Sequence, residues 1–549
     1  FMAGKPRKRE YYSYLLLTCA AAVGAVLAAN LVVFLLFWGI LGVLLYAFLS
    51  LGSSRLATKG FFIIGAADFA LILGALFLYK LSGTLVMGEI QSLPVTSGLA
   101  VASFVLLMIG AIAKAGAIPF HSWIPDAADE VPAPVMAYLP ASLDKLLGIY
   151  FLTRICLDFF KLFPNTSLSI LLMFIGSLTI MVAVMMALIQ HDLKKLLSYH
   201  AISQVGYMVL GIGTGIPLGI AGGIFHMVNH AIYKSCLFLG GGSVEHNVKT
   251  TDINRLGGLA KFMPVTFITV LIAALSISGV PPFNGFFSKW MIYQGVVEGG
   301  KLSGSSLWII WLLAAMFGSA LTLASFVKLI HGTFLSSESD EVKKKLSKEK
   351  IKESPLSMLF PMVVLAGLCV VFGVFAYQVP LKLFIFPSVP HLSPPGLWIG
   401  WWQPGLTTIL IILGIIVGFI IYLIGKVRKG RVSEVYIGGE TVSSEMRVSG
   451  VDFYDTLRDF IGLRRLYEAA EKGALDIYRG MLSFAKGIGY FLWAMDRLAD
   501  LFWRGLSRVV LLVGKGCSLA HTGVLHTYLA WYLLGLAILL LVFLRGFGG

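Results

Sequence analysis

The sequence is poor in charge and in paired cysteine. Only 13% of its 549 residues are Asp, Glu, Lys or Arg, about half the share that is usual in a soluble globular chain. It contains no CxxC pair, no Gly-rich phosphate loop, no Ser/His/Asp set and no HExxH motif, so we expect no Fe–S cluster, zinc ion or other cofactor on this chain. The five scattered cysteines are expected to be small packing residues: Cys19, Cys156, Cys236, Cys369 and Cys517. Soluble chemistry by this chain alone is therefore not expected.

The sequence is rich in long runs of apolar residues. Hydrophobic residues make up 58% of the chain, and the mean hydropathy is +0.86. Runs of about 20 apolar residues, each long enough to cross a bilayer as a helix, recur along nearly the whole length. The pattern predicts an all-α polytopic membrane protein with about thirteen transmembrane helices. They are expected near residues 13–29, 31–52, 58–80, 97–118, 132–153, 168–189, 198–217, 218–241, 265–297, 305–333, 357–378, 405–426 and 521–546.

Basic residues are distributed unevenly between the loops. The formal net charge is +15, which in a membrane protein indicates basic cytoplasmic loops rather than nucleic-acid binding. If the N-terminal "GKPRKRE" lies inside, alternation of the spans places "HDLKK" (191–195), "VKTTDINRLGGLAK" (248–261) and "KVRKGR" (426–431) inside as well. The positive-inside rule therefore predicts an integral membrane protein with these basic loops in the cytoplasm.

Residues 451–510 carry an amphipathic pattern that is too polar to span a membrane. Apolar residues recur at spacings of four and three from Phe484 to Phe502, with charged residues between them. We expect a cytoplasmic-side segment, 428–520, that lies against lipid or a partner and precedes a final transmembrane helix within 521–549. Several glycines predict that the segment is interrupted rather than one continuous helix: Gly462, Gly473, Gly480, Gly487 and Gly489.

Several ionisable residues lie within the predicted spans, where a buried charge costs several kcal/mol unless it is paired or hydrated. We treat each as a candidate ion-translocation residue. They are Asp68, Lys114, Asp144, Lys145, His226, His230, Lys234 and Lys289. Two simpler interpretations stay open: Lys289 lies near enough to a helix end to reach an interface, and Asp144 with Lys145 is also explained as a local pair.

Two histidines and a lysine share one stripe of a predicted helix. His226, His230 and Lys234 stand at positions i, i+4 and i+8, so the stripe turns by about 40° at each step. Because histidine exchanges protons near neutral pH, such a stripe is typical of a proton path. Metal binding by the two histidines is the weaker alternative, since no third ligand is evident nearby.

Proline interrupts the spans that carry Lys114 and Lys289. Pro119 follows the first lysine, and Pro281 and Pro282 precede the second. Paired broken helices in corresponding halves indicate an inverted-repeat transporter whose path lies at mid-membrane. Unwound backbone at this depth must face protein or water, and such hydration also accommodates the charge of a lysine.

Four segments are more specific: "AKAGAIPFHSWIPDA", "HDLKKLLSYHAISQVGYM", "HMVNHAIYKSCLFLGGGSV" and "SGVPPFNGFFSKW". They resemble the antiporter-like, proton-conducting subunits of respiratory complex I, Mrp-type Na⁺/H⁺ antiporters and membrane-bound energy-converting hydrogenases. The resemblance covers about residues 1–333. It implies a prokaryotic cytoplasmic membrane and two inverted five-helix repeats with broken helices, at 1–153 and 154–333. Two further spans within 334–427 follow, and then a C-terminal surface helix and last span similar to those of the distal complex I subunit.

The resemblance also implies roles for the buried residues. Lys114 corresponds to the lysine of the first repeat, and Asp68 to an acid near it. Lys145 corresponds to a connecting residue, and Lys289 to the lysine of the second repeat. The central relay corresponds to His226, His230 and Lys234. Two departures from the family pattern bear on these roles. Gly39 stands where the family has a glutamate, so either Asp68 alone tunes Lys114, which is the pairing we expect, or coupling in the first repeat is altered. The chain also begins about three helices late, which we expect to mean that it is shortened or that those helices belong to another polypeptide.

The leading hypothesis is an ion-translocating subunit, for H⁺ or Na⁺, of a redox-driven membrane complex. Its expected partners are other antiporter-like and small membrane subunits and a peripheral redox module. Fe–S clusters, with a NiFe centre or a flavin as further candidates, are expected in those partners. The alternatives are a module of a non-redox Na⁺/H⁺ antiporter and a structural membrane subunit that has lost conduction. A solute carrier for sugars or amino acids does not explain the line of lysines and histidines.

Overall fold

The computed structural model describes residues 1–90, 92–304, 306–348, 350–389, 463–474 and 476–546, together with scattered positions between 390 and 462. These residues form helices and turns, and no β-strand occurs among them. The predicted all-α class is therefore confirmed. By its internal contacts the chain divides into two compact units, Phe1–Tyr478 and Arg479–Gly549.

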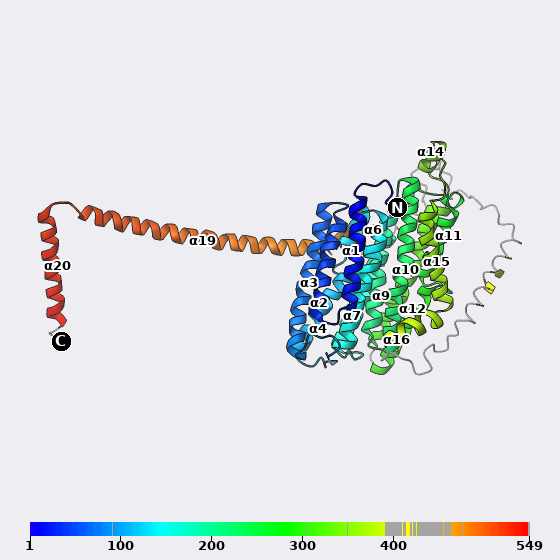
Figure 1. The fold of residues 1–549 in the computed structure, drawn as a ribbon, viewed down its shortest axis with the longest axis horizontal. Coiled ribbons are helices and arrows are strands. Elements are labelled where there is room, and N and C mark those ends of the chain that lie inside the picture. The colour runs from blue at the N-terminus through cyan, green and yellow to red at the C-terminus, as the bar shows by residue number, and fades with distance from the viewer. Residues whose placement is uncertain are drawn as a thin grey trace. The chain divides into compact units, whose positions relative to one another are not determined.

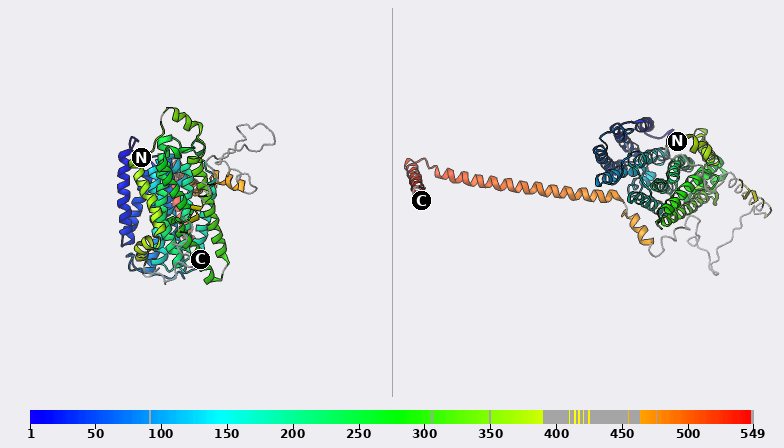
Figure 2. Two further views of the ribbon diagram at one scale, coloured as in Figure 1. Left: turned by 90° about the vertical axis from the view of Figure 1, so that its right-hand side faces the viewer. Right: turned by 90° about the horizontal axis from the view of Figure 1, so that it is seen from below.

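The first unit is a bundle whose long helices run side by side (Figures 1 and 2). Its first half contains α1 (Lys8–Leu27), α2 (Leu31–Leu49), α3 (Ser54–Ser82), α4 (Gly98–Ala115), α5 (Trp123–Glu130), α6 (Ala133–Tyr138), the π-helical turn η1 (Leu139–Leu143), α7 (Asp144–Arg154) and η2 (Ile155–Phe159). The second half contains α8 (Ser167–Leu188), α9 (Leu193–Gly213), α10 (Pro217–Val248), α11 (Pro264–Ser278), α12 (Asn284–Ser303) and α13 (Leu307–Ile330). The later elements are η5 (His331–Leu335), α14 (Asp340–Lys348), α15 (Leu356–Val374), η6 (Tyr377–Ile385), α16 (Phe386–Ser388) and α18 (Leu463–Glu471).

Nine helical runs among the described residues are long and apolar enough to cross a membrane. They include α1 to α4, the run from α6 to η2, and α8. The predicted count of thirteen is not confirmed, and the span expected at 405–426 lies outside the described residues apart from scattered positions. The single span expected at 265–297 is two helices, α11 and α12, separated at residues 279–283.

Helix α10 lies at the centre of the bundle. It packs against α6, η1 and α7 of the first half, against α9, α11 and α12 of the second, and against the later helix α15. The side chains around it form a continuous apolar core that includes Ala141, Leu197, Tyr233 and Leu237. Any polar side chain on the inner faces of α10 is therefore enclosed by helices from both halves.

One end of the bundle is defined by its loops. The segment between α8 and α9 pairs with the stretch after α10, where the Leu193 amide donates to the Thr251 carbonyl over 2.8 Å. This end carries Lys194, Lys195, Lys249 and Lys261, and we call it the basic end. Figure 1 shows the chain's N-terminus and α14 at this end.

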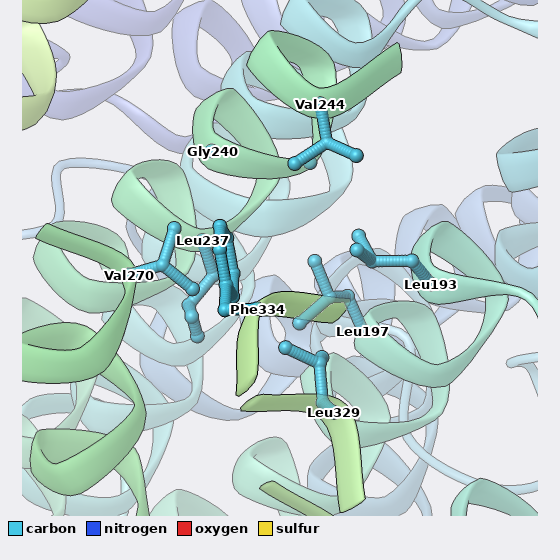
Figure 3. Close-up of a pocket in the computed structure, with 9 residues that line it drawn as sticks. Leu193, Leu197, Leu237, Gly240, Val244, Val270, Leu329 and Phe334 are labelled. Carbon is cyan, nitrogen blue, oxygen red and sulfur yellow. The ribbon is translucent and has the colours of Figure 1, made fainter. Parts of the chain in front are cut away.

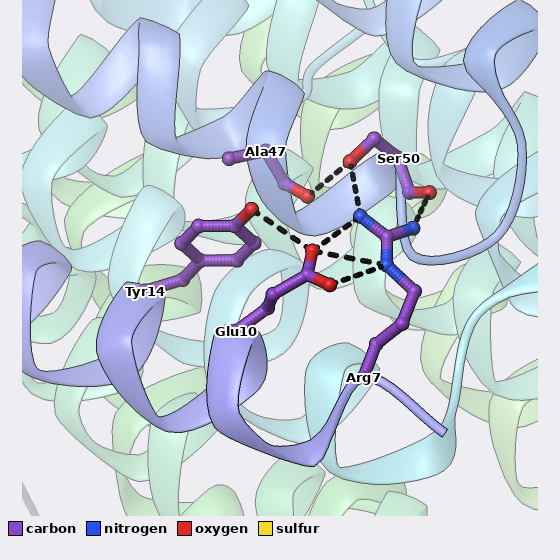
Figure 4. A network of polar contacts seen from close by, with 5 residues as sticks. All are labelled: Arg7, Glu10, Tyr14, Ala47 and Ser50. Carbon is purple, nitrogen blue, oxygen red and sulfur yellow. Dashed lines mark hydrogen bonds and ion pairs between the residues drawn. The ribbon is translucent and has the colours of Figure 1, made fainter. Parts of the chain in front are cut away.

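The start of α1 is fastened to the end of α2 by an ionic network (Figure 4). The guanidinium of Arg7 pairs with Glu10 at 2.6 Å and donates to the Ser50 carbonyl. Tyr14 donates to Glu10 over 3.3 Å, and the Ser50 hydroxyl donates to the Ala47 carbonyl over 2.7 Å. These contacts fix the relative register of the first two helices.

The second unit consists of most of α19 (Ile477–Ala520) and of α20 (Leu525–Gly546). The expectation of an interrupted amphipathic segment was wrong within α19, which runs through Gly480, Gly487 and Gly489 as one helix of 44 residues. Each glycine costs only about 1 kcal/mol relative to alanine, and neighbours with high helix propensity offset this cost. The chain does leave the helical path between α18 and α19, where Gly473 has a φ of +78°.

Candidate ion-translocation site

Lys114 lies in the last turn of α4, where the helix stops. The chain is not helical from Gly116 to Ser122, a stretch that includes Pro119. The lysine is 1% exposed, and its Nζ lies 4.0 Å from Oδ1 of Asp144, the first residue of α7. Neither Nζ of Lys114 nor either carboxylate oxygen of Asp144 has a hydrogen-bond partner among the described residues. The two charges face each other across α4 and α7 without a closer contact.

Asp68 lies near this pair but is held by another residue. Its Oδ1 accepts a hydrogen bond from the Trp38 indole over 2.7 Å, and the Trp38 ring lies 5.3 Å from Nζ of Lys114, within the range of a cation–π interaction. Gly39, the next residue of α2, is exposed, and a Cβ built there would meet no atom within 4 Å. An acid at position 39 would therefore point away from Lys114, and the carboxylate in ion-pair distance of that lysine is Asp144.

Lys145 continues the site toward the centre of the bundle. It is 1% exposed, and its ammonium donates to the Ala115 carbonyl over 3.2 Å at the end of α4. The approach of α7 to α4 depends on Gly148, where a Cβ would lie 2.5 Å from the Ala115 amide nitrogen. Asp144 and Lys145 directly follow the π-helical turn η1, a type of irregularity that is frequent at functional sites.

The three residues of the α10 stripe are all buried, and each has different surroundings. His226 shares hydrogen bonds with Ser288 at 2.9 Å and with Gln204 at 3.1 Å. Lys234 donates to the Leu197 carbonyl over 2.6 Å. His230, between them on the stripe, is 1% exposed, and α10 packs against α7, which carries Lys145. The stripe therefore connects the lysine of α7 with helices α9 and α12.

Lys289 lies behind the second helix break. It is 2% exposed and belongs to α12, which begins at Asn284 after a non-helical stretch that contains Pro281 and Pro282. Its ammonium donates to the Ile277 carbonyl over 2.9 Å and to the Ser319 hydroxyl over 3.1 Å. Its burial and these bonds place it inside the bundle and not at an interface.

Asn229 holds the start of α12 against α10. Its amide nitrogen donates to the Asn284 carbonyl over 3.0 Å, and the Asn284 amide donates back to Asn229 Oδ1 over 2.9 Å. Ser276, near the end of α11, also donates to Asn284. The second helix break is therefore tied directly to the helix that carries His226 and His230.

Aromatic rings and hydroxyl groups complete the connection between His230 and Lys289. The His230 and Tyr233 rings are 5.6 Å apart, and the Tyr233 hydroxyl lies 3.3 Å from His226 Nε2. The Tyr207 ring lies 5.5 Å from that of His226 and 4.7 Å from Nζ of Lys289. We call the buried series from Lys114 through Lys145 and the α10 stripe to Lys289 the central line.

Sequence reasoning missed several members of this site. They are Trp38, His200, Gln204, Asn229, Ser288 and Lys328, all buried or hydrogen-bonded to a predicted site residue. His200 carried a usable signal, a histidine inside an apolar span. The others depend on which helices meet, which spacing along one helix does not show. No group of three or more metal-ligating side chains occurs in the described part of the chain.

The family model "NADH:quinone oxidoreductase/Mrp antiporter, TM" matches residues 28–322. This is more than half of the chain and contains the whole central line. The protein belongs to this family. The resemblance stated from its motifs is thus confirmed.

Its relatives include components of several kinds of membrane complex. The chloroplastic NAD(P)H-quinone oxidoreductase subunit 5 of Chaetosphaeridium globosum is 33% identical over 75% of this chain and 64% of its own length. A Na⁺/H⁺ antiporter component from Alkalihalophilus pseudofirmus is 32% identical over 69% of this chain and 50% of its own length. Hydrogenase-4 component B of Escherichia coli is 32% identical over 61% of this chain and 51% of its own length. The chain thus spans between half and two thirds of these relatives.

Solved structures also support the fold, one of them over nearly the whole chain. A chain of the archaeal membrane-bound sulfane sulfur reductase superposes with a TM-score of 0.70 at 26% identity, covering 98% of this protein and 84% of that chain. A chain of respiratory complex I from Thermus thermophilus gives a TM-score of 0.60 at 22% identity, covering 70% of this protein and 78% of that chain. These proteins are all parts of multisubunit membrane complexes.

Proposed function

We propose that this chain translocates ions across a membrane as one subunit of a larger complex. The observation that supports this most directly is the central line, which carries four buried lysines and two buried histidines through both halves of the bundle. Burial of an ionisable group at membrane depth costs several kcal/mol. A role in packing alone does not account for this cost, whereas transfer of charge along the line does.

In the proposed mechanism, a change of charge near Lys114 alters its balance with Asp144. The proton then moves through Lys145 and the α10 stripe to Lys289, which exchanges with the opposite side of the membrane. Moving one charge against 100 mV costs about 2.3 kcal/mol. We assign that energy to a redox module in partner subunits, which would carry Fe–S clusters, with a NiFe centre or a flavin as further candidates. The names of the oxidoreductase and hydrogenase relatives support this choice.

A module of a Na⁺/H⁺ antiporter without redox partners is the second candidate. It is supported by the antiporter relative, whose identity and coverage are similar to those of the oxidoreductase relative. Purification of the complex through a tag on this chain separates the two. Chains with Fe–S, NiFe or flavin absorbance support the first candidate, and purification with small membrane subunits alone supports the second.

We further propose an organisation and an orientation. Residues 1–153 and 154–333 form two inverted repeats, each with one broken helix, and residues 334–427 contribute two more spans. The basic end faces the cytoplasm of a prokaryotic cell, in agreement with its lysine-rich loops. The amphipathic helix α19 then lies on that side, against lipid or a neighbouring antiporter-like subunit.

Replacement of Lys114 by alanine tests the proposed function. In the purified complex, reconstituted into lipid vesicles, Lys114→Ala should reduce ion translocation at least tenfold while electron transfer by the partners is partly retained. The control is Lys80→Ala, because Lys80 is an exposed lysine at the end of α3. Unchanged translocation by the Lys114→Ala complex would contradict the proposal.

A further inference from the structure

Two buried basic residues lie outside the central line, close to the basic end. Lys328, in the last turn of α13, is 3% exposed and donates to the Leu188 carbonyl over 2.8 Å. His200, on α9, is completely buried. Because Leu188 is the last residue of α8, Lys328 lies at the level of the loops that form the basic end.

A hydroxyl connects the two helices that carry these residues. Ser325, one turn before Lys328 on α13, is completely buried, and its Oγ lies 2.8 Å from His200 Nε2. The second ring nitrogen of His200, Nδ1, is buried without a hydrogen-bond partner among the described residues. A structural histidine in an apolar core normally uses both nitrogens or is replaced by an apolar residue, since an unpaired buried polar atom costs about 1–3 kcal/mol.

His200 also lies beside the central line. Lys234 donates to the carbonyl of Leu197, which stands one turn before His200 on α9. The Phe326 ring contacts both residues, at 4.8 Å from the His200 ring and 5.8 Å from Nζ of Lys234.

Helix α13 carries hydroxyl groups onward from this point. Ser319, which accepts from Lys289, is followed at intervals of three residues by Thr322, Ser325 and Lys328. Successive members are one turn apart, so each lies next to the following one as the series winds around the helix. Figure 3 shows a neighbouring hollow lined by apolar side chains, among them Leu197, Leu237 and Leu329. Among the described residues, no polar side chain lines this hollow, whereas the α13 series offers hydroxyl groups.

We propose that Lys328, Ser325 and His200 form a proton branch that joins the basic end to Lys234 of the central line. The inference rests on the proposed function. In one transfer, the Lys328 ammonium gives a proton to Ser325 Oγ while that hydroxyl gives its own proton to His200 Nε2. The imidazolium then releases its Nδ1 proton toward the Lys234 amine. The net change is one proton lost by Lys328 and one gained by Lys234. Amine and imidazole nitrogens bind protons far better than Na⁺, so the branch carries protons whichever ion crosses elsewhere.

Two substitutions of His200 separate proton transfer from packing. His200→Gln keeps a side chain that hydrogen-bonds to Ser325 but does not titrate, whereas His200→Phe removes both properties. In the reconstituted complex, both variants should lower the number of protons translocated per electron at least fivefold, with normal co-purification of partners and electron transfer partly retained. The matched control is His331→Gln, because His331 is exposed one turn beyond Lys328 and should change nothing. Ser325→Ala should reproduce the loss if His200→Phe fails to assemble.

The outcomes distinguish the branch from the proposed function as a whole. Normal proton translocation by His200→Gln, together with loss in Lys114→Ala, would overturn the branch and leave the function standing. Normal translocation in both variants would overturn the function itself. Loss in His200→Gln and in Ser325→Ala, with His331→Gln unaffected, would support the branch.

Discussion

The pair of Lys114 and Asp144 shows how loosely charge is held at the centre of the first half. The two groups are 4.0 Å apart with side chains 0% and 2% exposed, and neither has a hydrogen bond among the described residues. A buried ion pair usually recovers its desolvation cost only through close geometry and further hydrogen bonds. This pair has neither, so it stabilises the fold weakly and is easily altered by a charge that arrives nearby.

Substitutions of Lys114 and Asp144 should affect the stability of the fold and ion transport differently. Asp144→Leu removes the carboxylate within ion-pair distance of the buried Lys114 and should cost about 3–5 kcal/mol, seen as a lower unfolding temperature of the purified protein. The double variant Lys114→Met with Asp144→Leu removes both charges and should recover most of that stability. Neither variant should translocate ions. Transport by the double variant would show that the exchange site lies elsewhere.

At the scale of helices, the site depends on how closely α4 and α7 approach. Lys145 reaches the Ala115 carbonyl because Gly148, one turn further along α7, allows backbone contact with α4. The sequence showed the lysines and prolines but not this contact, because a glycine in an apolar span has many possible neighbours. Gly39, which drew attention as a departure from the family pattern, has open space around its Cβ position.

These two glycines therefore offer a matched pair. Gly148→Ala places a methyl group 2.5 Å from the Ala115 amide nitrogen and should destabilise the bundle by about 1–3 kcal/mol. It should also lower transport by displacing Lys145. Gly39→Ala should not lower the unfolding temperature, because alanine has the higher helix propensity and its methyl group meets open space, and it should leave transport unchanged. Thermal unfolding and vesicle transport measure both effects, and equal behaviour of the two variants would refute the close-approach argument.

A second contact between elements docks the start of α19 on the bundle. Asp476 accepts from Lys59 over 2.7 Å and from Ser122 over 2.6 Å, and Lys59 also pairs with Asp126 of α5 at 2.8 Å. Partial burial by itself would raise the pKa of Asp476, but the hydrogen bonds from Lys59 and Ser122 outweigh it and lower the pKa below its ordinary value. The ionised form is therefore the one that docks this segment beside the first helix break.

The stability contributed by Asp476 should follow from the direction of that shift. A carboxylate with a lowered pKa contributes fully above the ordinary pKa of aspartate, near 3.9, and loses its contribution as the pH falls through the lowered value. Between pH 5 and 8, the protection that Asp476 gives the backbone amides of residues 463–474 against exchange should thus stay constant. Within that pH range Asp476→Asn should raise the exchange severalfold, whereas Asp500→Asn, in an exposed pair on α19, should not. Equal exchange in Asp476→Asn and the wild type would disprove the docking role.

At the scale of the whole molecule, the sequence was a good guide to helices and a partial guide to the site. Apolar runs and prolines located the main helices and the breaks near Lys114 and Lys289, because the lipid requirement acts on each segment separately. The acid paired with Lys114 could not be chosen from sequence, since Asp144 and Asp68 both lie within predicted spans. Nor could His200 be linked to Ser325, because that contact joins helices 125 residues apart.

The division into two units predicts how the chain tolerates truncation. No residue of α19 or α20 within 479–546 is buried, so removal of everything after Tyr478 should leave the bundle's unfolding temperature within about 2 °C of the full chain. Removal after residue 462 also deletes Tyr467, which is 4% exposed and donates to the Met185 carbonyl over 3.2 Å, and Asp476 with its ion pair. That shorter protein should unfold at least 4 °C lower, a shift of the size that about 1–2 kcal/mol produces in a large domain. Equal unfolding temperatures for the two truncations would show that residues 463–478 add nothing to the bundle.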